Sequence, residues 1–112
     1  MHIAGAHLTP IGSGDFLLEP TRGLDTTRSD YLIEEILAQL QEGKGQRLYY
    51  DLSELALIDP VYYQWLRTLA HACQAVNIKM LCIHMQPTAA YGLSQFLQET
   101  PPFVCALDVE RD

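Results

Sequence analysis

The segment from Arg47 to Pro60, RLYYDLSELALIDP, constrains the fold of this chain more than any other stretch. It begins with a short, nearly continuous apolar run at residues 48–50, which is typical of a strand covered on both faces in a parallel sheet. Asp59 then suits a helix N-cap, and Pro60 suits the first helical position, where a missing N–H costs nothing. The segment therefore predicts a buried strand, a short loop and the start of a helix.

Length and charge limit the class of protein. The 112 residues are enough for one domain, and a hydrophobic content of 48% is typical of a globular chain. Seven basic against fourteen acidic residues give a formal net charge of −7. Surfaces for nucleic acid or anionic lipid need basic side chains, so this balance argues against both. We expect a single domain, residues 1–112, that binds a protein partner and no nucleic acid.

Cysteine usage and hydropathy indicate the compartment. Cys73, Cys82 and Cys105 lie far apart in apolar stretches, which favours reduced core residues over a disulfide or a metal site. The start of the chain lacks the basic and apolar regions of a signal peptide, and no apolar stretch approaches the roughly 20 residues that span a bilayer. We expect a soluble, cytoplasmic protein without direct membrane insertion.

Periodicity predicts the elements before the central segment. Extended segments at residues 6–11 and 16–19 flank a Gly-Ser-Gly turn and predict a hairpin, in which Pro10 indicates an edge strand. Thr27 stands three places before Asp30, in a loose capping-box spacing. Gly43 is the expected C′ stop of the helix that follows. The apolar stripe of that helix is Leu32, Ile33, Ile36, Leu37 and Leu40.

The elements after the central strand complete an alternating order. A second helix runs from Pro60 to about Asn77, a strand covers residues 78–85, a third helix opens at Pro87, and a last strand covers 103–107. The third helix is expected to turn Ala90, Leu93, Phe96 and Leu97 inward. The order β-β-α-β-α-β-α-β predicts an α/β fold, namely a mixed, mostly parallel sheet with helices packed on it and the N-terminal hairpin as its edge.

The residues at the expected working end show no catalytic pattern. In open α/β sheets this end lies beyond the carboxyl ends of the strands, which here holds Asp51, Asp59 and the loops around Asp25 and Gln86. Asp51 invites comparison with a phosphoryl-accepting aspartate, but the first strand has no acidic metal ligands, so loop carboxylates that cap backbone N–H groups are favoured. Metal, hydrolase, P-loop and dinucleotide motifs are missing from the sequence. We expect no enzyme, no metal and no cofactor.

An aromatic group marks the start of the second helix. Tyr62 and Trp65 fall on its apolar stripe, whereas Tyr63 falls on the other side. An exposed Tyr63 beside Gln64 and Arg67 suits a protein interface, while a role in the core is the alternative.

Three stretches resemble the STAS domains, the family of anti-sigma factor antagonists. Residues 51–59, DLSELALID, match the family pattern of Asp, hydrophobic, Ser, and a later hydrophobic-Asp pair that is usually followed by Ser or Thr. Residues 23–28, GLDTTR, before an apolar helix resemble stressosome scaffold STAS domains, and residues 85–90, MQPTAA, resemble the family's strand-to-helix turn. The predicted order of elements also matches that family over nearly the whole chain. The resemblance implies a STAS-like fold.

The same resemblance implies a phosphorylation switch that this sequence has altered. In the family a partner kinase phosphorylates a Ser or Thr at the start of the central helix, and the added charge switches partners. Here Pro60 and Val61 follow Asp59, and neither has a hydroxyl. Thr26 matches a second phosphorylatable threonine of stressosome scaffolds. Thr26 and Thr27 are therefore candidate phosphorylation sites, although both are also plausible helix caps.

The expected function is a non-catalytic regulatory module of bacteria, an anti-sigma factor antagonist or a stressosome-type signalling component. Its partner would be a kinase-like anti-sigma factor or another STAS protein, and a homodimer is possible because the family usually continues into another helix. The alternative is a cytosolic STAS subunit of a membrane complex that transports lipids or anions; a small enzyme or ligand binder is a third class. The expected partner-binding residues are Asp59, Pro60, Val61, Tyr63, Gln64 and Arg67.

Overall fold

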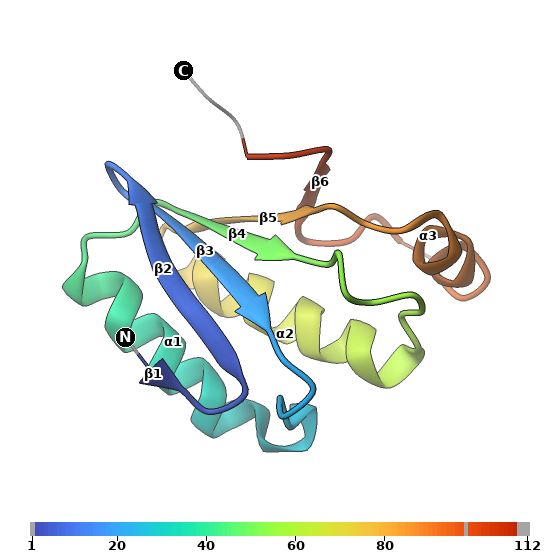
Figure 1. The fold of residues 1–112 in the computed structure, drawn as a ribbon, viewed down its shortest axis with the longest axis horizontal. Helices are drawn as coiled ribbons and strands as arrows, with labels where there is room; N and C mark the ends of the chain where they lie inside the picture. Colours follow the sequence, from blue (N-terminus) through green and yellow to red (C-terminus); the bar gives the residue numbers. More distant parts are fainter. Residues whose placement is uncertain (1, 98, 110–112) are drawn as a thin grey trace.

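The computed structural model describes residues 2–97 and 99–109, which form one sheet with three α-helices (Figure 1). The described strands make a six-stranded sheet in the order β1-β2-β3-β4-β5-β6. The elements are β1 (His2–Ile3), β2 (Ala6–Gly12), β3 (Asp15–Pro20), the 3-10 helix η1 (Thr26–Arg28), α1 (Ser29–Glu42), β4 (Arg47–Asp51), α2 (Pro60–Ala75), β5 (Lys79–Ile83), α3 (Pro87–Ser94) and β6 (Val104–Ala106).

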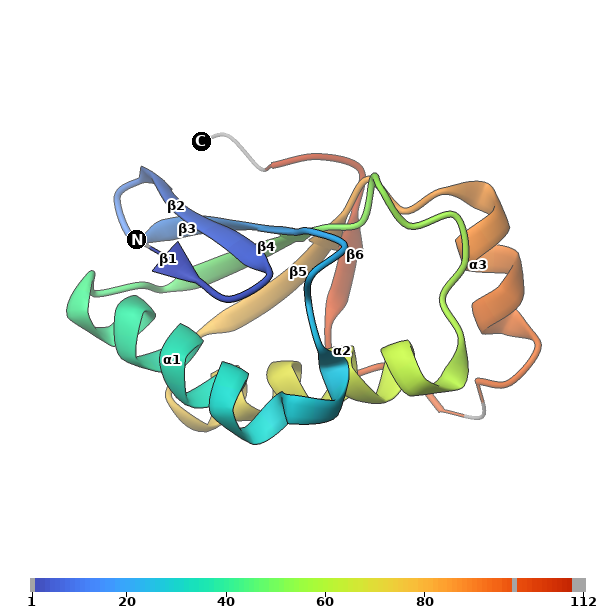
Figure 2. The same cartoon turned by 60° about the horizontal axis from the view of Figure 1, so that its bottom comes forward.

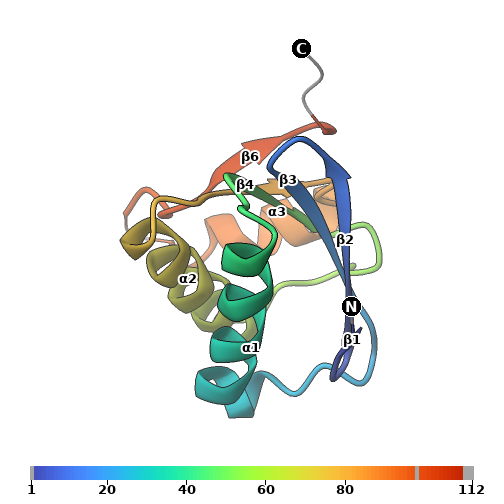
Figure 3. The ribbon, with the colours of Figure 1, turned by 90° about the vertical axis from the view of Figure 1, so that its left-hand side faces the viewer.

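The strand directions confirm the predicted mixed, mostly parallel sheet. β1, β2 and β3 pair antiparallel, whereas β3, β4, β5 and β6 pair parallel. The strand order follows the chain without reversal, so right-handed connections put successive helices on the same face. Figures 2 and 3 show α1 and α2 side by side on one face, which we call the helix-covered face, and α3 beyond the carboxyl end of the sheet. The segment after β6 passes over the opposite, outer face.

The N-terminal edge is more elaborate than a hairpin. β1 pairs with β2 only through His2↔His7 and Ile3↔Ala6, and the sequence pattern had not predicted it. Pro10 lies beyond this short pairing, near an irregularity of the β2–β3 ladder, where its missing N–H breaks no bond to β1. The edge position that Pro10 predicted is therefore confirmed for that half of β2.

Most of the core lies between the sheet and the two long helices. Leu48 and Tyr50 of β4 are fully buried there, and Cys73 and Cys82 are buried as well. Burial raises the pKa of the Cys73 thiol to about 12. Cys105 is exposed on β6, so its expected place in the core was wrong. The predicted stripe of α1 is confirmed, because Leu32, Ile33, Ile36 and Leu40 are buried and Leu37 is partly buried against the same core. On α2 the predicted Trp65 is buried and Tyr62 partly buried; the helix also buries Leu66, Leu69, Ala70 and Cys73.

The first long helix ends differently from the prediction. Gly43 has a φ of −86°, and the left-handed residue is Lys44 with a φ of 55°. A Cβ on Gly43 would lie 2.4 Å from Cζ of Phe16. Glycine is therefore needed here for close approach to an aromatic ring rather than for a left-handed stop. Asn77, with a φ of 63°, does end α2 as predicted.

The third helix is shorter than its apolar pattern suggested. Ala89 and Leu93 are buried and lie four residues apart on one helix face, while Ala90 is exposed, contrary to the prediction. α3 ends at Ser94, so Phe96 and Leu97 pack against the core from the segment that follows it. The inward direction of these two side chains was right, but their place in a helix was not.

Candidate functional site

The start of α2 is built as the sequence predicts. Asp59 has extended backbone, with φ −86° and ψ 172°, and its carboxylate accepts a hydrogen bond of 2.8 Å from the Tyr62 N–H. Pro60 occupies the first helical turn. Pro60 and Val61 follow Asp59, where the STAS resemblance leads one to expect a hydroxyl, and Val61 is an apolar side chain that is 62% exposed. The first turn of α2 thus offers an apolar contact to solvent.

Just before α1, the two candidate phosphorylation sites, Thr26 and Thr27, have different surroundings. Asp25 caps η1 by accepting from the Thr27 N–H at 3.0 Å and from the Thr27 hydroxyl at 2.5 Å. The side-chain bond from Thr27, followed by its backbone bond, lowers the pKa of the Asp25 carboxyl. The hydroxyl of Thr27 is therefore bonded to the N-cap residue Asp25. The cap that forms here is this one, and the Thr27–Asp30 capping box that the spacing suggested is not observed. Thr26 instead is partly buried and lines a groove.

These two helix starts face each other across the η1–α2 groove, a cavity of about 330 Å³. β3 and β4 are parallel neighbours, so the segments that follow their carboxyl ends begin at the same edge of the sheet. The structure thereby brings the candidate Thr26 together with three expected partner-binding residues, Pro60, Val61 and Gln64. No side chain of the lining is charged: it consists of Thr26, Ser29, Pro60, Val61, Gln64, Trp65 and Thr68.

A buried hydrogen-bond network fixes the floor of this groove. Trp65 is only 2% exposed, and its Nε1–H donates to the Tyr50 hydroxyl at 2.9 Å. The hydroxyls of Tyr50 and Tyr62 lie 2.6 Å apart. Tyr50 accepts from Trp65, so it can donate its own proton to Tyr62. Burial is the main cause that raises the pKa of Tyr62 to about 12, so both phenols stay neutral and the network holds α2 against β4.

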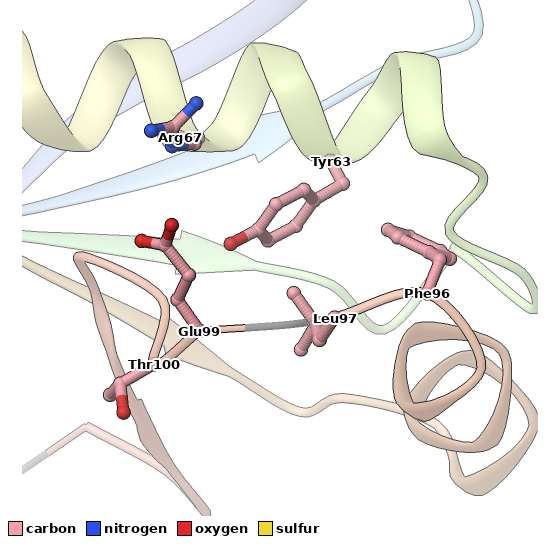
Figure 4. Close-up of a pocket in the computed structure, with 6 residues that line it drawn as sticks. All are labelled: Tyr63, Arg67, Phe96, Leu97, Glu99 and Thr100. Carbon is pink, nitrogen blue, oxygen red and sulfur yellow. The ribbon is translucent and has the colours of Figure 1, made fainter.

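Tyr63 and Arg67 lie on a different side of α2 from the groove. The Tyr63 ring makes edge contacts with Phe96 and Phe103, at centroid distances of 5.7 and 6.2 Å. Figure 4 shows this ring reaching from α2 toward Leu97 and Glu99, and burial raises the pKa of its phenol. Of the two alternatives for Tyr63, the structure favours the core: its side chain is partly buried, because the segment after α3 packs on that side. A smaller cavity of about 190 Å³ is lined by Tyr63, Arg67, Phe96, Leu97, Glu99 and Thr100.

Sequence reasoning missed two exposed apolar residues, one on the loop before α2 and one on α3. Leu57 is 63% exposed and Tyr91 is 70% exposed. The loop that carries Leu57 is tied to α3, because the Thr88 hydroxyl donates to the Ala56 carbonyl at 2.5 Å. A Cβ on Gly92 would lie 3.0 Å from Cδ1 of Leu57, which shows how closely the loop approaches the helix. Leu57 stands inside the STAS-like segment and could have been noticed, whereas no local pattern indicates Tyr91.

Asp51 acts as a loop carboxylate. Its Oδ1 accepts from the Ser53 N–H at 2.9 Å and lies 3.1 Å from Nδ1 of His84. Among residues 2–97 and 99–109, no group of three His, Cys, Asp or Glu side chains is arranged to hold a metal ion. Over the same part of the chain, no helix is both long and apolar enough to cross a bilayer.

Comparisons with known proteins define the fold. No model of a known family matches the chain, and no curated protein gives a significant match. A serine-to-glutamate variant of RsbS from Moorella thermoacetica superposes with a TM-score of 0.72 at 16% identity, over 93% of this chain and 87% of that one. A chain of the stressosome, described as a signal integration and transduction hub, gives 0.72 at 15% identity, over 92% and 89%. The protein TM1081 gives 0.65 at 12% identity, over 85% and 74%.

These likenesses establish the class of fold. The chain has the mixed α/β fold of STAS domains, as the three resembling stretches predicted. Within that class, one of the similar structures is RsbS and another is a chain of the stressosome.

Proposed function

We propose that this chain is a non-catalytic regulatory module that binds another protein through the η1–α2 groove. The observation that carries the proposal is the meeting of Thr26 with Pro60 and Val61 along one uncharged cavity. The likeness to RsbS and to a stressosome chain supports a stressosome-type or anti-sigma factor antagonist role. The partner is a kinase-like anti-sigma factor or another STAS protein in the bacterial cytoplasm, and a homodimer is one form such pairing takes.

The chemistry of the groove suits a protein partner. The chain has a net charge of −7, yet the lining of the groove carries no charged side chain. Interface centres are typically depleted of charge and contain apolar or aromatic anchors. Here Val61 extends into solvent at the rim, and the Tyr50–Trp65 bond holds the floor rigid. A preorganised surface of this kind loses little side-chain freedom when it binds.

Control of binding would differ from the usual switch of the family. Pro60 and Val61 have no hydroxyl, so binding at the start of α2 is constitutive in our proposal. Thr26 is the proposed phosphorylation site, because it lines the groove while the Thr27 hydroxyl is held by Asp25. A phosphate adds about −1.5 to −2 charge at neutral pH. Placed in an uncharged groove, it would oppose an apolar partner contact.

The test is affinity capture from bacterial extract with the tagged chain, followed by mass spectrometry. We expect Val61→Glu to reduce recovery of the partner by about tenfold or more, since it puts a charge at the rim of an apolar contact. The matched control is Ile11→Glu, which places the same charge on a 39%-exposed apolar residue of β2, near the opposite end of the sheet.

Two results would contradict the proposal. One is equal recovery of the partner by the chain with Val61 and the chain with Val61→Glu. The other is a specific partner that is neither kinase-like nor STAS-containing; recovery of a transporter ATPase would instead favour the role of a cytosolic subunit of a lipid or anion transport complex.

A further inference from the structure

Three titratable side chains, none of which lines the η1–α2 groove, meet at the carboxyl end of the sheet. Asp51 ends β4, His84 directly follows β5, and Asp108 comes shortly after β6. Because these three strands are parallel neighbours, their carboxyl ends reach the same edge. His84 Nδ1 lies 3.1 Å from Oδ1 of Asp51, and its Nε2 lies 3.2 Å from Oδ1 of Asp108. One imidazole therefore bridges two carboxylates from two other segments.

This geometry favours the charged form of the histidine. A neutral imidazole has one N–H donor and one bare nitrogen, whereas a carboxylate can only accept. Only the imidazolium can donate to Asp51 and Asp108 at once, and both bonds are then charge-assisted. The hydrogen bond with Asp51 is the largest cause that raises the pKa of His84, and Asp108 adds to it, while partial burial acts in the opposite direction.

The backbone at His84 is unusual in the same place. Its φ of 59° lies in the left-handed region, which few non-glycine residues adopt and which carries a conformational cost. His84 is one of three described non-glycine residues with positive φ; the other two, Lys44 and Asn77, stand just beyond helix ends, where such a turn is common. At His84 the strained residue instead carries the ring that joins the two carboxylates.

The bridge holds a segment that covers the outer face. Asp108 Oδ1 also accepts from the Val109 N–H at 2.7 Å. Val109 in turn packs on the buried cluster of Tyr49, Leu81 and Ile83 on the outer face. In the described chain no helix lies over the outer face (Figure 2). The contact of Val109 is therefore part of what keeps this cluster from solvent.

We propose that Asp51, His84 and Asp108 form a proton-operated latch, in which protonated His84 holds the segment after β6 on the outer face. When His84 loses its proton, the bonds to both carboxylates cannot be kept together, and the segment with Val109 loosens from Tyr49, Leu81 and Ile83. The latch is a conformational device that is independent of the proposed function of the groove.

The sign of the pH effect follows from the neighbouring charges. Among the described residues, two further carboxylates lie beside Asp51: Glu19 of β3 and Glu54 of the loop after β4. Together with His7 they help to line a cavity of about 210 Å³ that Asp51 also borders. A histidine whose pKa is raised in the closed state stabilises that state fully below its ordinary pKa of about 6.5. The stabilisation is lost as the pH rises through the raised value.

The experiment is a pH titration of the full chain by NMR. It follows the ring proton of His84 and the through-space contacts of the Val109 methyl groups with Leu81 and Ile83. We expect His84 to titrate above the ordinary histidine pKa of about 6.5. With the same midpoint, the ratio of closed to open segment should fall roughly two- to fivefold, as for an ion pair whose side chains are partly exposed to solvent.

Two variants keep the latch testable. The variant His84→Asn removes the charge, while asparagine tolerates the left-handed backbone at this position. In this variant the Val109 contacts should be weak, and they should not change with pH over the histidine range of roughly 6 to 8. The matched control, His71→Asn, removes a histidine from the exposed face of α2 and should leave the Val109 titration unchanged. A His84 midpoint at or below the ordinary histidine pKa of about 6.5, or Val109 contacts that do not follow the titration of His84, would overturn the proposal.

Discussion

Two neighbouring residues of β4 show how differently the faces of this sheet are built. Tyr49 and Tyr50 are both 0% exposed, and they point to opposite faces. Tyr50 lies in the large core under the helices, where its hydroxyl bonds to Trp65 and Tyr62. Tyr49 lies in the small cluster of the outer face, with the Arg47 guanidinium 5.7 Å from its ring.

The difference follows from the strand order. Since the order never reverses, right-handed connections place α1 and α2 on one face only. The outer face is therefore covered by a side chain and a short segment instead of by helices. Arg47, which is paired bidentately with Asp15 at 2.8 Å, covers one part, and the segment with Val109 covers another. A strand can thus look buried on both faces in sequence although helices cover only one of them.

Truncating one leucine on each face tests this comparison with the largest expected effect. Leu66 of α2 and Leu81 of β5 are both 0% exposed. We expect Leu66→Ala to lower the free energy of unfolding by about 4 kcal/mol, because the rigid core around it cannot collapse into the cavity. Leu81→Ala should cost about 2 kcal/mol, because the thin cover of the outer face can relax. Chemical denaturation measures both, and equal costs would show that the two faces are packed alike.

Removing the Tyr50 hydroxyl tests the helix-covered side of this comparison, with a smaller expected change in the free energy of unfolding. Tyr50→Phe leaves the Trp65 N–H and the Tyr62 hydroxyl without their shared partner, so we expect a loss of about 1–3 kcal/mol in the free energy of unfolding. The emission of Trp65, the one tryptophan of the chain, should change as well. The matched control is Tyr31→Phe, whose exposed hydroxyl makes only a 3.4 Å contact with Glu35 and should matter by less than about 0.5 kcal/mol. A Tyr50→Phe chain as stable as this control would mean that the network does not hold α2.

The fold was predictable where the signals are local. The apolar stripes of α1 and α2, the Asp59 cap and the first-turn Pro60 all act within a few residues, and the structure confirms them. Helix periodicity left the place of Tyr63 open between interface and core, because the packing of the segment after α3 against its ring is a long-range contact that periodicity does not contain. Gly43 was misread for a similar reason, since the ring that excludes a Cβ there belongs to Phe16, far away in sequence.

The candidate site was only partly predictable. The STAS resemblance pointed separately to Thr26 and to the start of α2, and the groove between them arises because β3 and β4 are parallel neighbours. The Asp25 cap separates the two threonines: it takes up the Thr27 hydroxyl two residues along the chain, whereas Thr26 lines the groove. The bridge of His84 joins residues that are 33 and 24 positions from it, which no sequence spacing reveals.

The most direct test of the central claim, that the η1–α2 groove binds the partner, is amide hydrogen exchange read by mass spectrometry. The full chain is measured alone and in complex with the partner recovered by capture. We predict slower exchange in residues 26–29 and 60–68 of the complex, with no change in residues 6–12 of β2. Protection confined to other surfaces, with both groove segments exchanging as in the free chain, would contradict the account.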